Sequence, residues 1–180
     1  MQTWNDEALL QHIQAGSHQA FTVLVERHTG RFFRIAYRFT ASQEEAEEIV
    51  QEAFLKLWQH PDMWQAGKNA KFTTWFYRVV TNHSLDHKKK QRAVMLEDGT
   101  TVPDERHMQD ETLICTEEQK MLEAAIQALP ERQQTALNLC FYEHLSNQEA
   151  ADIMGVNLKA LQSLLMRAKT TLKDRLKAYW

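Results

Sequence analysis

Helical spacing of apolar residues runs through nearly the whole chain and constrains its fold more than any other feature. The segment SQEEAEEIVQEAFLKLWQHP is the clearest case, because Ser42 and Glu45 match the capping-box pattern at its start and Pro61 stops it. Apolar residues at i, i+3, i+4 and i+7 predict one buried stripe there: Ala46, Ile49, Val50, Ala53, Phe54, Leu57 and Trp58. With no alternating strand-like runs, and only five Gly and three Pro, we predict an all-α fold.

The same signals divide the chain into two small helical domains. Ser17 caps a first helix through about His28, which we expect to end near Gly30. Other helices are expected at 31–39, 71–92 and 116–129, and after a break at Pro130 a further helix runs to about 143. From 93 to 115 the periodicity fails while Gly, Pro and acidic residues accumulate, which is long for a connection inside one domain. We therefore predict domains at 1–92 and 116–180, joined by a flexible acidic linker at 93–115.

Charge is distributed in blocks along the chain. The net charge of −3 argues against a free-standing DNA-binding protein, but basic residues concentrate at 71–92 and 159–177. The charged residues of 44–52 are all acidic, and those of 97–111 are acidic except for Arg106. Two basic zones with an acidic stretch between them indicate two contact surfaces for a polyanion.

The segment LSNQEAADIMGVNLKALQSLLMRAK, residues 145–169, has the pattern of a helix-turn-helix. Ser146 and Glu149 form a second capping box, Gly155 suits a turn with positive φ, and Asn157 suits the cap of the next helix. Small and apolar residues would hold the two helices together: Ala150, Ala151, Ile153, Met154, Val156, Leu158, Leu161, Leu164 and Leu165. Such a motif projects its second helix into a major groove.

The exposed side of that second helix carries the predicted DNA contacts. They are Lys159, Gln162, Ser163, Met166, Arg167 and Lys169. Arg and Gln can read base edges, while Ser and Lys serve phosphates as readily. The alternative is an ordinary helical hairpin whose basic face is only solvated.

Enzyme, metal and membrane classes find little support in the sequence. There is no phosphate-binding GxxxxGK[ST] loop, no GxSxG, and no nucleophile beside a recognisable base, so we expect no catalysis and no cofactor. His83 and His87 have the i, i+4 spacing of a chelating pair but lack a third ligand, so we read them as surface histidines. Cys115 and Cys140 form no CxxC pair, Cys140 being expected in the core. No bilayer-length apolar segment or signal peptide occurs, so we expect a cytoplasmic protein.

Three segments, taken in order, resemble one known family. Residues 44–58 (EEAEEIVQEAFLKLW), 71–92 (KFTTWFYRVVTNHSLDHKKKQR) and 122–172 are similar to extracytoplasmic-function (group IV) sigma factors. These are small two-domain initiation subunits of bacterial RNA polymerase. The resemblance implies a non-enzymatic, monomeric subunit that depends on the polymerase core, with an anti-sigma factor holding it inactive.

The resemblance implies that the first domain docks on the clamp helices of the largest polymerase subunit. The residues matched to that contact are Glu47, Glu48, Gln51, Glu52 and Phe54. An amphipathic helix with a free acidic side fits a basic partner, although the same charges also fit a merely solvated face.

In the family, the helix matched by 71–92 and the loop before it open the minus-ten promoter element. The matched residues are Lys68, Asn69, Ala70 and Lys71 in the loop, then Trp75, Arg78 and Asn82. A melted strand needs cations, rings for stacking and polar groups for base edges. Phe72, Trp75 and Phe76 are also spaced as core residues, together with Val79 and Val80. Lys88, Lys89, Lys90 and Arg92 would meet phosphates or remain solvated.

The second domain would read the minus-thirty-five element, with Gln162 standing where many relatives carry Arg. Because of that difference, the sequence does not identify the promoter that is read. It also does not identify the inducing signal or the type of anti-sigma factor. The acidic linker would either imitate nucleic acid in the polymerase channel or serve as a spacer. The main alternative is a stand-alone helix-turn-helix regulator that binds a palindromic site as a dimer. That alternative does not explain why EEIVQEAFLKLW resembles the sigma-factor family.

Overall fold

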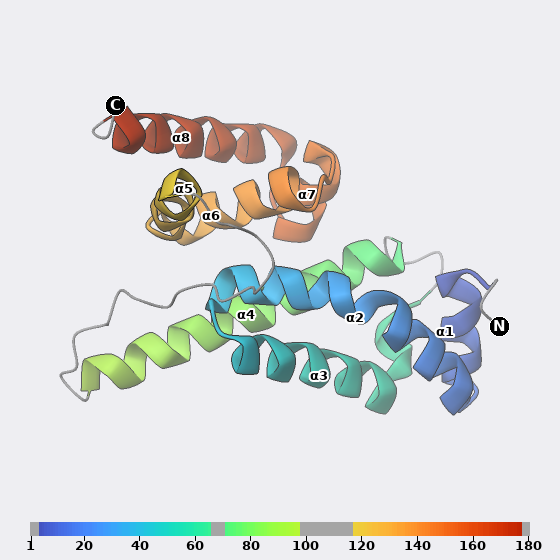
Figure 1. Cartoon of the computed structure of the whole chain (residues 1–180). Coiled ribbons are helices and arrows are strands. Elements are labelled where there is room, and N and C mark those ends of the chain that lie inside the picture. The colour runs from blue at the N-terminus through green and yellow to red at the C-terminus, as the bar shows by residue number, and fades with distance from the viewer. Residues whose placement is uncertain (1–3, 66–70, 98–116, 178–180) are drawn as a thin grey trace. The chain divides into compact units, whose positions relative to one another are not determined.

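The computed structural model describes residues 4–65, 71–97 and 117–177, and every regular element in these ranges is helical (Figure 1). The chain forms two compact units, Met1–Arg106 and His107–Trp180. The all-α prediction is thus confirmed for the described residues. None of the described helices is both long and apolar enough to cross a membrane.

The described part of the first unit contains four α-helices and a short 3-10 turn. They are α1 (Asp6–Gln14), α2 (His18–Thr40), α3 (Gln43–Gln59), η1 (Pro61–Met63) and α4 (Phe72–Glu97). Side-chain oxygens cap the first three helices: those of Asn5, Ser17 and Ser42 accept from backbone N–H groups three residues later. Figure 1 shows α2 lying along both α3 and α4.

Two helix boundaries differ from the sequence prediction. Gly30 does not end a helix, because α2 continues through it to Thr40 and closes at Ala41, which adopts the left-handed conformation with φ 54°. Helix α4 runs to Glu97, five residues beyond the expected end at Arg92. Between Arg92 and Gly99 the sequence has neither Gly nor Pro, so no residue stops the helix at Arg92. The rest of the expected linker, 98–115, lies outside the described residues.

Aromatic rings form the core of the first unit. Phe76, fully buried on α4, lies 4.6 Å from the Phe32 ring of α2 and 4.7 Å from the Phe54 ring of α3, measured between centroids. Tyr77, 1% exposed, was not predicted as core but packs on Phe32. Three residues of the predicted stripes are only half-buried: Trp58, Trp75 and Val79.

The second unit consists of short helices packed against one long one. They are α5 (Glu117–Gln127), α6 (Glu131–Leu137), the π-helical segment η2 (Asn138–Tyr142), α7 (Asn147–Met154) and α8 (Leu158–Lys177). Pro130 separates α5 from α6 as predicted. The core contains Ile126, Leu129, Leu137 and Ala168, with Tyr142 and Leu172 packed against it.

The π-helical segment replaces the last part of a helix that we expected to be regular. The N–H of Glu143 donates to the carbonyl of Asn138, five residues back, at 3.2 Å. The wider turn leaves Phe141 54% exposed and Cys140 half-buried, so the prediction of a core Cys140 is wrong.

The helix-turn-helix has the predicted geometry. Ser146 Oγ accepts from the Glu149 N–H at 3.2 Å, and Glu149 Oε2 accepts from the Ser146 N–H at 3.0 Å, which completes the capping box. Gly155 ends α7 in the left-handed region, with φ 63°. Asn157 Oδ1 accepts from the Ala160 N–H at 2.7 Å and so caps α8. Leu158 was expected at the helix interface but is 38% exposed.

Candidate polymerase-binding and DNA-binding surfaces

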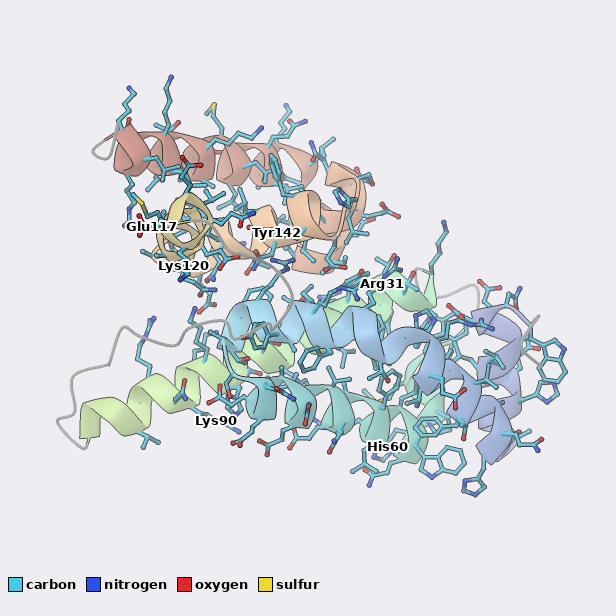
Figure 2. All side chains as sticks on the ribbon, in the orientation of Figure 1. Arg31, His60, Lys90, Glu117, Lys120 and Tyr142 are labelled. Carbon is cyan, nitrogen blue, oxygen red and sulfur yellow. The ribbon has the colours of Figure 1, made fainter. Side chains whose placement is uncertain are left out.

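The outer side of α3 is an exposed surface that is mostly acidic. We call it the α3 acidic surface, and it consists of Glu44, Glu47, Glu48, Gln51, Glu52 and Leu55. It lies opposite the buried stripe, and Figure 2 shows oxygen-tipped side chains projecting outward along this helix. Two acidic residues lie in the first turn, where the helix dipole favours negative charge.

The structure corrects two details of the predicted polymerase contact. Phe54 is 4% exposed and packs between Phe21 and Phe76, so it belongs to the core and is not on the surface. Leu55, by contrast, is 52% exposed and lies one turn after Gln51, at the C-terminal end of the surface. The sequence prediction missed it. Its place outside the i, i+3, i+4 stripe was the available signal.

The flank of α3 that faces α4 is lined by charged and polar pairs. Lys56 Nζ lies 3.0 Å from His83 Nε2, and His83 Nδ1 lies 3.9 Å from Glu52 Oε2. One turn along α4, His87 Nδ1 lies 3.7 Å from Glu45 Oε2. Burial, followed by the charge of Lys56, lowers the pKa of His83. We read His83 from the sequence as a surface histidine, but with 19% of its side chain exposed it is half-buried.

One side of α4 carries four of the residues predicted to contact promoter DNA. The spacing i, i+3, i+7, i+14 places Trp75, Arg78, Asn82 and Lys89 along one side of the helix, which we call the α4 row. Arg78, Asn82 and Lys89 are exposed. Trp75 is half-buried, with its ring on Phe72 and Phe76, so part of its surface remains available for stacking.

The other predicted residues near this helix are less closely grouped. Lys71 is exposed immediately before α4, and Arg92 is exposed near its end. Lys88 is half-buried and lies on a different side from the α4 row. Lys68 and Asn69, with Ala70, lie outside the described residues.

The outward side of α8 presents the predicted base-reading residues in two adjoining rows. Spacing places Gln162, Met166 and Lys169 in one row, and Lys159, Ser163 and Arg167 in the next. All are exposed except Ser163, which is half-buried. Lys169 Nζ lies 5.4 Å above the ring centroid of Phe141, a cation–π contact that the sequence did not reveal.

The described residues contain no group of three or more His, Cys, Asp or Glu side chains placed to hold a metal ion. Cys140 Sγ instead lies 3.7 Å from Asn147 Oδ1, and burial raises the pKa of its thiol. Cys115 is outside the described residues.

Both units match protein families. Residues 24–94 match Sigma-70 region 2, and residues 119–172 match Sigma-70, region 4. The first match contains the α3 acidic surface and the α4 row, and the second contains the helix-turn-helix.

Relatives extend the similarity over most of the chain. The ECF RNA polymerase sigma factor SigE of Mycolicibacterium smegmatis is 31% identical over 157 residues, covering 85% of this chain and 60% of that protein. SigW of Bacillus subtilis is 24% identical, over 93% of this chain and 95% of its own length. The sigma-E factor of Haemophilus influenzae is 26% identical, over 95% of each. This chain belongs to the extracytoplasmic-function RNA polymerase sigma factors.

Solved structures share the fold. CnrH, in complex with the cytosolic domain of CnrY, has a TM-score of 0.72 and 22% identity, covering 96% of this chain and 97% of its own. RpoE of Bartonella quintana, in complex with the anti-sigma factor NepR, has a TM-score of 0.68 and 23% identity, covering 87% and 96%.

Proposed function

We propose that this protein binds the bacterial RNA polymerase core and directs promoter-specific initiation of transcription. One observation carries the proposal. The first unit of this sigma-factor chain exposes the α3 acidic surface and the α4 row, and the second unit exposes a helix-turn-helix. A protein-binding surface and two DNA-binding surfaces are what a subunit that brings polymerase to a promoter needs.

Each surface has a chemically matched partner. The α3 acidic surface suits a basic partner, and we propose the clamp helices of the polymerase's largest subunit, with Glu47, Glu48, Gln51 and Glu52 as the contacts. The α4 row offers cations for phosphates and a Trp ring for an unstacked base, which suits the melted minus-ten element. The exposed rows of α8 suit the major groove of the minus-thirty-five element.

The family also supports proposals for the regulation of this protein and for where it acts. The structural neighbour RpoE was solved with an anti-sigma factor, so we propose that a protein of that kind controls this chain as well. The proposed protein is a monomeric, non-enzymatic polymerase subunit of the bacterial cytoplasm, and the catalysis belongs to the core.

Transcription by purified core polymerase on a pool of promoter fragments from the source genome tests the proposal. We expect discrete new start sites in the presence of the protein. They should disappear with Arg167→Ala, and with Glu47→Lys combined with Glu48→Lys. The matched controls are Arg175→Ala on α8 and the exposed α5 pair Glu117→Lys with Glu118→Lys, which should leave the start sites intact.

The contrary result is also specific. If the protein fails to bind core polymerase at low salt yet binds duplex DNA tightly alone, the proposal is wrong. The chain would then act as a stand-alone helix-turn-helix regulator.

A further inference from the structure

We propose that His83 is a positioning residue for the polymerase contact, because it holds the Lys56 ammonium away from Glu52 and so keeps the α3 acidic surface negative. This inference rests on the proposed function of that surface. It concerns a histidine that lies outside the predicted contact residues and on a different helix.

Sequence spacing alone would pair Glu52 with Lys56. The two residues are at i, i+4 on α3 with the acid nearer the N-terminus, which is the favourable order for an ion pair on an isolated helix. Such a pair would neutralise one of the carboxylates offered to a basic partner. An exposed pair of this kind is weak, so a competing acceptor nearby can displace it.

The tertiary structure supplies that acceptor. Lys56 Nζ lies 3.0 Å from His83 Nε2, a distance at which the ammonium donates to a neutral imidazole. The other ring nitrogen, Nδ1, faces Glu52 Oε2 at 3.9 Å. The ring thus stands between the cation and the carboxylate, and 57% of the Glu52 side chain remains exposed.

The arrangement depends on the protonation state of His83. A protonated ring has no lone pair for Lys56, repels its ammonium and attracts the Glu52 carboxylate. The other charged groups facing the ring are Asp86 and Lys90, both on α4. Burial and the Lys56 charge lower the pKa of His83, which favours the neutral ring near pH 7. Acidification therefore adds positive charge beside the α3 acidic surface and should weaken binding to a basic partner.

Binding of purified core polymerase to the labelled full-length protein, measured between about pH 5.5 and 8, tests this dependence. Between the two ends of this pH range, we expect the affinity of the wild type for core to fall about twofold to fivefold more than the affinity of His83→Gln. The glutamine amide keeps a donor and an acceptor but does not titrate. Titration of groups on the core polymerase affects both variants equally, so it cancels in the ratio of their affinities. His12→Gln, on α1, is the control histidine and should follow the wild type.

A second pair of variants separates positioning from folding. His83→Ala should bind core about twofold to fivefold more weakly at neutral pH and with less dependence on salt, because Lys56 turns to Glu52. Removing that cation as well, in His83→Ala with Lys56→Ala, should restore the affinity. A merely structural loss would not be restored.

The inference is overturned if the wild type and His83→Gln show the same pH profile, or if Lys56→Ala fails to restore binding to His83→Ala. Either result leaves the proposed function intact, provided that the wild type binds core and reversal of Glu47 and Glu48 abolishes binding. No binding of the wild type at any pH would overturn both proposals.

Discussion

At the scale of single residues, two glycines show how differently the same side chain can be used. Gly155 ends α7 with φ 63°, a left-handed conformation in which an L side chain is strained. Gly30 lies inside α2 with helical neighbours on both sides. A Cβ there would meet Arg34 Nη1 at 3.8 Å, an ordinary van der Waals contact. The first glycine is required by the turn, and the second is a weak point in a helix.

Substitution of each glycine by alanine should therefore have opposite effects. We expect Gly155→Ala to lower the free energy of unfolding of the second unit by about 1 to 2 kcal/mol. Gly30→Ala should raise that of the first unit by about 0.5 to 1 kcal/mol, because alanine loses less backbone entropy in a helix. Urea unfolding followed by circular dichroism measures both. Equal effects of the two substitutions would contradict this assignment of their conformations.

At the scale of elements, a carboxylate near the start of α1 ties that helix to α2. Asp6 Oδ1 accepts from Arg27 Nη1 at 2.7 Å, and Asp6 Oδ2 lies 2.9 Å from Nε2 of the buried His28. Burial alone would raise the pKa of Asp6, but the hydrogen bonds and charges of His28 and Arg27 lower it below 3.8. Helix α1 was not among the helices predicted from sequence, and this pairing between distant residues could not be read from local pattern.

The lowered pKa gives this contact a defined pH dependence. The ionised carboxylate stabilises the folded chain above about pH 4, and that contribution is lost as the pH falls through the folded-state pKa of Asp6. We expect Asp6→Asn to reduce the free energy of unfolding by about 2 kcal/mol at pH 7, with the difference from wild type shrinking toward pH 3. Glu7→Gln, in the same helical turn, controls for the helix dipole. A difference that stays constant with pH would rule out the ionised pair.

The sequence predicted those parts of each element that depend on contacts between neighbouring residues. The Ser146–Glu149 capping box, the turn at Gly155 and the Asn157 cap all use hydrogen bonds within a few residues, so sequence alone identified them. It failed at the end of α4, where no residue stops the helix, and at η2, where the π-helical turn has no local signature.

At the scale of the whole molecule, each unit has a core of its own. The first is built around Phe32, Phe54, Phe72 and Phe76, and the second around Ile126, Leu129, Leu137 and Ala168. Because neither list contains residues of the other unit, cooperative unfolding should be confined largely to one unit at a time. The two proposed DNA-binding surfaces lie on different units.

Core truncations should therefore act on one unit only. We expect Phe76→Ala to lower the stability of the first unit by about 3 to 5 kcal/mol, and Leu139→Ala to lower that of the second by about 2 to 5 kcal/mol. Both side chains are fully buried. Hydrogen exchange monitored by mass spectrometry resolves the two units. Loss of protection in both units after either substitution would show that they unfold together.

The sequence by itself determined the helical class, the two-unit organisation, the helix-turn-helix and the acidic side of α3. These depend on periodicity and on contacts within a few residues, where the physics is local. Only the tertiary structure decided that Phe54 is core and Leu55 is exposed, that Phe141 underlies Lys169, and that Lys56 turns to His83. Those outcomes depend on which helix packs against which, and the spacing of residues along one helix does not contain that information.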